Sequence, residues 1–216
     1  MTFLVVLVGW IFSLCLHEFS HALVAYRGGD YTVREKGYLT FNPLKYTHPV
    51  YSIVLPLLFL LVGGIGLPGG AVYIETWRLR SRRWVSAVSL AGPSANLLLA
   101  IVLGLVLRYA PADRSGIWPG LAFLAFLQVS AVILNLIPLP PFDGFGAIEP
   151  YLPMSIRSGM AQVRGMLPLV VFFLLWYVPF FYQGFWSVVN SLSSLLGVPF
   201  DLVALGYQGF QFWQPH

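Results

Sequence analysis

Two histidines and a glutamate stand together in an apolar stretch near the start of the chain: His17, Glu18 and His21. Residues four apart on a helix lie on one face, about one turn apart. The two imidazoles could therefore converge on one Zn²⁺ at roughly 2.0–2.1 Å. Glu18 lies beside the first histidine, where it could take a proton from a water that the metal activates. The spacing predicts a hydrolytic zinc site.

The surroundings of these three residues favour a functional site over a solvated helix end. An ionisable side chain at membrane depth costs about 2.5–3.5 kcal/mol on insertion scales, which makes it a functional candidate by default. The alternative is that the three polar residues end a helix at the membrane interface. However, residues 22–26 continue the apolar run beyond His21, so the cluster is not terminal.

A third metal ligand is needed, because a catalytic zinc usually has three protein ligands and an open position. His48 precedes a proline in a loop-like segment and His216 is the last residue, so a carboxylate is the remaining candidate. Asp143 follows a stretch, 138–141, in which three of four residues are proline and no helix can continue. Such a segment could present one carboxylate to a metal held elsewhere. The alternative is that Asp143 only caps a turn.

The composition indicates which elements must position these residues. Hydrophobic residues make up 58% of the 216 residues and charged residues only 9%, against roughly 25% charged in soluble domains. This balance excludes a soluble globular fold and indicates a polytopic membrane protein. The single cysteine, Cys15, excludes an internal disulfide and a CxxC metal site. The net charge of +4 forms no basic stripe, so no nucleic-acid partner is expected.

We expect an all-α polytopic membrane protein with about five to six membrane segments. Between the helix that carries His17 and the one near residue 85, we expect a segment that is re-entrant or contains β structure. The first helix is expected to remain uncleaved, because it lacks a signal-peptide charge pattern. The segment 186–205 is broken by Gly197 and Pro199 and either spans or lies at the interface. Helices are predicted near 2–26, 85–108, 117–138 and 166–183.

The apolar segment 49–67 is ambiguous, and the positive charges help to place it. If it crosses, the twelve lysines and arginines divide evenly between the two sides. If it enters and leaves on one side, ten fall on that side, and only Arg108 and Arg114 lie opposite. Positive residues gather on the cytoplasmic side, so we favour a re-entrant segment with the N-terminus outside. An ordinary crossing helix remains the alternative.

Four stretches together resemble the site-2 protease family of intramembrane zinc metalloproteases. They are HEFSH at 17–21, GGAVYI at 69–74, AGPSAN at 91–96 and NLIPLPPFDG at 135–144. They occur in the family's order and cover about residues 10–150. The segment 37–45 resembles the compact branch of this family, which lacks PDZ and CBS domains.

The resemblance implies a role for each residue of the cluster. His17, His21 and Asp143 would hold one Zn²⁺ per chain, Glu18 would be the catalytic base, and Asn135 would be a polar group near the scissile carbonyl. The branch often has a histidine and an aspartate just after the segment 37–45. Tyr46 and His48 occupy those two places here, so that pair has no assigned role.

Two further groups of residues are expected around this centre. An exposed strand could hold an unwound substrate by β-augmentation, although a plain loop is equally compatible; its residues are Gly70, Ala71, Val72 and Tyr73. Small and polar residues of the following helix are expected to give structural support; they are Gly92, Pro93 and Asn96.

We expect one membrane-embedded domain over 1–216, with a core over about 1–150 and C-terminal helices over about 151–216. The predicted activity is hydrolysis of peptide bonds in or near transmembrane segments of membrane proteins. The expected location is a prokaryotic plasma membrane, with the site towards the cytoplasmic half and the lipid bilayer around it. The sequence leaves the oligomeric state open. A zinc-binding transporter and a non-catalytic membrane scaffold are the alternatives.

Overall fold

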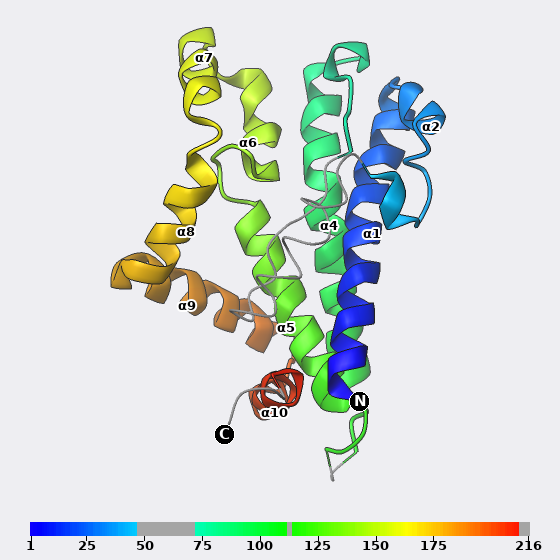
Figure 1. Ribbon diagram of the computed structural model, residues 1–216, viewed down its shortest axis with the longest axis vertical. Coiled ribbons are helices and arrows are strands. Elements are labelled where there is room, and N and C mark those ends of the chain that lie inside the picture. The colour runs from blue at the N-terminus through cyan, green and yellow to red at the C-terminus, as the bar shows by residue number, and fades with distance from the viewer. Residues whose placement is uncertain (47–71, 112–113, 212–216) are drawn as a thin grey trace.

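The computed structural model describes residues 1–46, 72–111 and 114–211, and in these ranges every regular element is helical (Figure 1). Figure 1 shows the three longest helices side by side along the long axis of the molecule. They are α1 (Thr2–Gly28), α4 (Arg82–Leu107) and α5 (Trp118–Asn135). The shorter helices are α2 (Thr32–Glu35), η1 (Pro43–Lys45), η3 (Thr76–Arg78), α6 (Asp143–Ile148), η4 (Glu149–Tyr151), α7 (Met154–Val163), α8 (Leu167–Tyr177), α9 (Pro179–Leu195) and α10 (Phe200–Phe210).

The described helices offer three to five membrane spans. α1, α4 and α5 are each long and apolar enough to cross a membrane. Two pairs, α7 with α8 and α9 with α10, meet the same criteria only when each pair is taken together, and they bend by 73° and 117° at their breaks. The all-helical architecture is therefore confirmed for this part of the chain, with three to five candidate spans where the sequence predicts about five to six membrane segments.

The single helix predicted over 166–183 is wrong, because the chain breaks in its middle. α8 ends at Tyr177, Val178 is extended with φ −109° and ψ 106°, and α9 starts at Pro179. A proline disfavours the helical conformation of the residue before it, which ends the helix there. With 11 residues, α8 is only about 17 Å long, short of the roughly 30 Å hydrocarbon core.

The break predicted at Gly197 and Pro199 is confirmed. α9 ends at Leu195 and α10 begins at Phe200. Gly197 has φ 76°, a left-handed conformation that glycine adopts without steric cost. The break lets α10 turn back and pack against α5, where Gly206 lies so close to the Pro119 carbonyl that no Cβ would fit.

The chain leaves α1 and enters α4 at the same end of the bundle. The Arg80 amide donates to the Gly28 carbonyl oxygen over 3.0 Å. Gly28 also lies directly beneath the side chains of Leu79 and Trp84. α1 and α4 are therefore antiparallel neighbours, as Figure 1 shows.

The described residues just before η3, 72–75, have no regular structure. Residues 72–75 belong to neither helix nor strand, and no strand occurs in the described ranges. The predicted strand at 70–74 is therefore not seen for Val72 and Tyr73. Gly70, Ala71 and the whole of 49–67 lie outside the described residues.

Candidate metal centre

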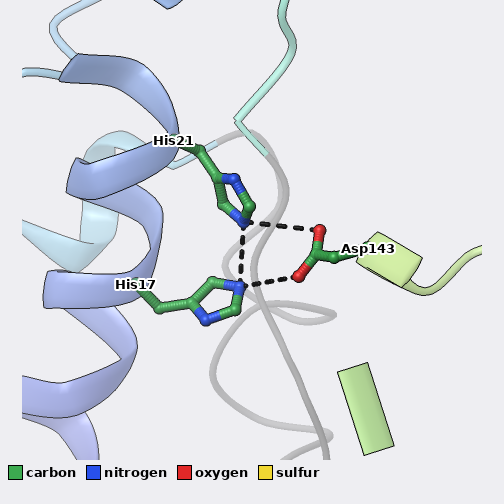
Figure 2. A group of neighbouring side chains, drawn as sticks. All are labelled: His17, His21 and Asp143. Carbon is green, nitrogen blue, oxygen red and sulfur yellow. Dashed lines mark hydrogen bonds and ion pairs between the residues drawn. The ribbon is translucent and has the colours of Figure 1, made fainter. Parts of the chain in front are cut away.

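The two histidines of α1 point from one face of the helix towards the same place. His17 and His21 are both buried, and their Nε2 atoms lie 2.9 Å apart. Figure 2 shows both rings turned away from α1 and towards Asp143. The one-turn spacing expected from the sequence therefore does bring two ring nitrogens together.

Asp143 brings a carboxylate to the same point from the first residue of α6. Its Oδ2 lies 3.2 Å from His17 Nε2 and its Oδ1 lies 3.4 Å from His21 Nε2. One donor atom from each of the three residues lies within 4.8 Å of the other two. These are the three residues that the sequence proposed as ligands, and they come from elements far apart in the chain.

The backbone after α5 determines where Asp143 lies. α5 ends at Asn135, and the proline-rich stretch turns the chain back before α6 begins. Gly144 then packs directly on the Leu136 and Ile137 carbonyls, where a Cβ would overlap backbone atoms. This close approach requires glycine at position 144.

A hydrogen bond at Nδ1, the ring nitrogen that faces away from the other ligands, orients each imidazole. His21 Nδ1 lies 2.6 Å from the Val88 carbonyl oxygen, which can only accept, so this nitrogen carries the proton. His17 Nδ1 lies 3.2 Å from Asn96 Oδ1 and donates to it in the same way. In the neutral rings, each Nε2 then presents a lone pair to the space that they share.

This arrangement fits a zinc ion. Two unprotonated Nε2 atoms cannot hydrogen-bond to each other, whereas a metal cation can bind both lone pairs and the carboxylate at once. In a tetrahedral site with bonds near 2.0–2.1 Å, neighbouring ligand atoms are roughly 3.3 Å apart. The separations of 2.9, 3.2 and 3.4 Å lie close to this value. The His–His–Asp set can therefore hold one ion and leave a position open.

Helix α4 closes one side of this cluster through Gly92. A Cβ at this position would overlap the Nε2 atoms of both His17 and His21. Pro93 follows and is also buried within α4. Sequence reasoning expected Gly92, Pro93 and Asn96 only to support helix packing. The structure gives Gly92 direct contact with the ligand rings and gives Asn96 a bond to one of them.

Glu18 lies on the same helix and is 3% exposed. Its Oε2 accepts a hydrogen bond from the Val72 amide over 3.1 Å. The segment that the sequence proposed for substrate binding therefore contacts the proposed base. Asn135 is buried at the last residue of α5, at the start of the turn that leads to Asp143.

Tyr46, which had no assigned role, joins the loop after α1 to α1 itself. Its buried hydroxyl lies 2.8 Å from the Thr40 carbonyl oxygen and 3.1 Å from that of Cys15. Burial raises the pKa of the Tyr46 hydroxyl, which keeps its proton available for donation. His48 lies outside the described residues.

Comparison with known proteins finds bacterial relatives that are named as zinc metalloproteases. The chain is 47% identical over 214 residues to "Putative zinc metalloprotease Rip2" of Mycolicibacterium smegmatis, a match that spans 98% of this chain and 81% of that protein. The protein of the same name from Mycobacterium tuberculosis is 45% identical with the same coverage. "Putative zinc metalloprotease YwhC" of Bacillus subtilis is 33% identical over 84% of each chain. No family profile and no solved structure matches the chain.

Two observations identify the class of protein. The sequence identity extends over nearly the whole chain, and the structure holds a His–His–Asp cluster able to bind one metal ion. The chain belongs to the site-2 protease family of zinc metalloproteases. Within it, the similarity is higher to the two Rip2 proteins than to the Bacillus subtilis relative. The resemblance read from the sequence is thereby confirmed.

Proposed function

We infer that this chain is an intramembrane zinc metalloprotease that hydrolyses peptide bonds in or beside transmembrane segments of protein substrates. The observation that carries this function is the meeting of His17, His21 and Asp143 beside the buried Glu18 on α1. The three ligand groups meet there, and Glu18 is buried on the same helix, between helices apolar enough to lie in a membrane.

His17, His21 and Asp143 would hold the zinc ion. Bound zinc supplies Lewis-acid chemistry, which polarises a carbonyl and lowers the pKa of a water to about 7. Glu18 takes a proton from the water as its oxygen attacks the carbonyl carbon, and it returns a proton to the amine nitrogen as the C–N bond breaks. Asn135 donates a hydrogen bond to the carbonyl oxygen as negative charge develops there.

The substrate must be locally unwound before attack, since a helix hides its carbonyls in its own hydrogen bonds. The segment at 70–74 is our proposed holding surface for an unwound, extended substrate. The hydrogen bond between the Val72 amide and Glu18 supports this proposal, because it places the segment at the base.

The topology that we propose puts the site towards the cytoplasm, with the N-terminus outside and 49–67 re-entrant. The bond between Arg80 and Gly28 supports it, since α1 ends and α4 begins at one end of the bundle. The bacterial relatives support a bacterial plasma membrane as the location. We also propose that 1–216 forms a single membrane-embedded domain.

The test combines zinc content with cleavage of a model transmembrane substrate in detergent. Wild type should hold roughly one zinc per chain and cleave. Glu18→Gln should keep the zinc and lose cleavage, because the amide cannot accept the proton. Asp143→Ala should lose zinc affinity. Glu35→Gln, an exposed change on α2, is the matched control and should behave as wild type.

Two results would contradict the proposal. Cleavage by Glu18→Gln at the wild-type rate would remove Glu18 from the mechanism. Full zinc binding without cleavage of any transmembrane substrate would instead favour a zinc transporter or a membrane scaffold. Either of those activities should largely survive the Glu18→Gln change.

A further inference from the structure

A fully buried carboxylate follows α1 and joins two parts of the chain. Asp30 is 0% exposed. Its Oδ1 accepts hydrogen bonds from the amide and the hydroxyl of Thr32, over 3.1 and 2.6 Å. Its Oδ2 accepts a hydrogen bond from the Glu75 amide over 2.8 Å. One oxygen therefore closes a local turn and the other holds a distant segment.

That distant segment is the one that reaches the proposed base. Glu75 lies three residues after Val72, whose amide donates to Glu18 Oε2 over 3.1 Å. The four residues 72–75 are thus held at both ends by carboxylates of α1 and its following turn, Glu18 at one end and Asp30 at the other. A shift at the Asp30 end is transmitted to the Val72 amide through only three residues of backbone.

Lys36 adds a second tether on the same side as Asp30. Its Nζ lies 2.9 Å from Glu75 Oε1, 3.4 Å from the Tyr73 carbonyl oxygen and 4.8 Å from the centre of the Tyr73 ring. Arg78 Nε donates to the other Glu75 oxygen over 2.6 Å. These bonds lie at the surface and are partly exposed, so the buried Asp30 is the firmer of the two tethers.

The tether requires a carboxylate at position 30. An asparagine could keep its oxygen towards Thr32, but its NH₂ group would then face the Glu75 amide, donor against donor. An unpaired buried donor is costly, so the segment would move away. Thr32 supplies two of the three bonds to this side chain, so the orientation that keeps them is the one we expect, and Asp30→Asn then removes the long-range bond with almost no change in shape.

We propose that Asp30 is a positioning residue, whose buried carboxylate holds residues 72–75 so that the Val72 amide fixes Glu18 and the segment faces the substrate. This inference rests on the proposed function, in which Glu18 is the base and the segment holds substrate. Asp30 contacts neither the metal ligands nor the reacting atoms in this assignment, and acts only through the 72–75 backbone.

The test measures backbone order and catalysis separately in purified full-length protein. In Asp30→Asn, hydrogen exchange at the Glu75 and Val72 amides should both accelerate, and kcat should fall about 10- to 100-fold, as expected when a base is displaced by about 1 Å. Zinc content should stay at the wild-type value. Asn42→Ala is the matched control, because Asn42 closes a similar turn to Leu44 without touching residues 72–75.

Several outcomes would overturn the inference. Unchanged exchange at Val72 would show that the segment does not depend on Asp30, and unchanged kcat with accelerated exchange would show that its position is irrelevant to catalysis. If wild type cleaves nothing, the proposed function fails, and exchange at Val72 still decides whether Asp30 holds the segment. If Asp30→Asn does not fold, exchange in the wild type decides: the Glu75 amide, which donates to Asp30, should be as protected as the Val72 amide, and an unprotected Glu75 amide would overturn the inference.

Discussion

The imidazoles of His17 and His21 are oriented by different kinds of hydrogen-bond partner. Only the partner of His17 can therefore be removed by a side-chain substitution. His21 donates to a backbone carbonyl, that of Val88, which no side-chain substitution removes. His17 donates to a side chain, that of Asn96. Gly92 lies against both rings from the opposite helix. The ligand set is therefore oriented by α4 as much as by α1.

Replacing Gly92 by alanine should abolish most zinc binding. The added Cβ would occupy the space of both Nε2 atoms, and neither ring can retreat without losing its bond to α4. Metal content of the purified variant should fall well below one zinc per chain. Gly159→Ala is the control, since a Cβ at Gly159 meets nothing within 4 Å. Full zinc content in Gly92→Ala would contradict the assigned packing.

Replacing Asn96 by alanine should weaken zinc binding without abolishing it. Loss of a partner behind a ligating histidine typically costs about 10–100-fold in metal affinity, because the ring orientation and tautomer are no longer fixed. Competition with a chromophoric chelator would measure the affinity. Asn190→Ala on the exposed face of α9 should leave it unchanged, and equal affinity in both variants would remove Asn96 from the site.

At the level of elements, short connecting segments position the chemistry and the long helices form the frame. The turn between α5 and α6 delivers Asp143, and the segment 72–75 reaches Glu18. The second of these is held at the surface by Lys36 and Arg78, which both bond to the Glu75 carboxylate. Such ion pairs make the anchoring of this segment dependent on pH.

The hydrogen bonds from Arg78 and Lys36 lower the pKa of Glu75 below its ordinary value of 4.5. A lowered pKa means that this carboxylate stabilises the fold above pH 4.5, and that the contribution is lost as the pH falls through the lowered value. Wild type should therefore melt higher than Glu75→Gln at pH 7, and the two curves should converge in acid. Glu35 forms no ion pair in the described part of the chain, so Glu35→Gln should melt with the wild type at every pH. A difference between the melting temperatures of wild type and Glu75→Gln that persists in acid would contradict the assigned role of the Glu75 carboxylate.

For the whole molecule, the metal would link α1 and α6, two helices that are far apart in the chain. The proposed ligands come from α1 and from α6, the first and one of the later helices of the chain. An ion that binds all three residues stabilises the folded state by mass action, since the unfolded chain does not bring them together. The metal is thus expected to act on stability as well as on activity.

Removal of zinc by a chelator should lower the melting temperature of the wild type in detergent. At free zinc 100 times the dissociation constant, the stabilisation is about 2.7 kcal/mol. A chain of this size shifts by about 2–4 °C per kcal/mol, so the expected decrease is roughly 5–10 °C, restored by added zinc. Asp143→Ala should show no such shift, and an equal shift in that variant would place the stabilising metal elsewhere.

Much of this molecule follows from local features of the sequence. The His17–His21 spacing, the apolar runs of α1, α4 and α5, and the break at Gly197 depend only on helix geometry, hydropathy and backbone sterics, which act within a few residues. The predicted helix over 166–183 is wrong for a local reason too, because Pro179 holds Val178 in an extended conformation despite the apolar residues on both sides.

The sequence by itself determined the chemical groups, their helices and the membrane class, because residue types and periodicity are local properties. Only the tertiary structure decided which distant groups meet: Asp143 with the histidines, Asn96 with His17, and Asp30 with the Glu75 amide. These contacts depend on how close two helices or loops can approach, and Gly92 and Gly144 allow that approach by lacking a Cβ. A glycine in a sequence does not reveal which side chain will lie against it.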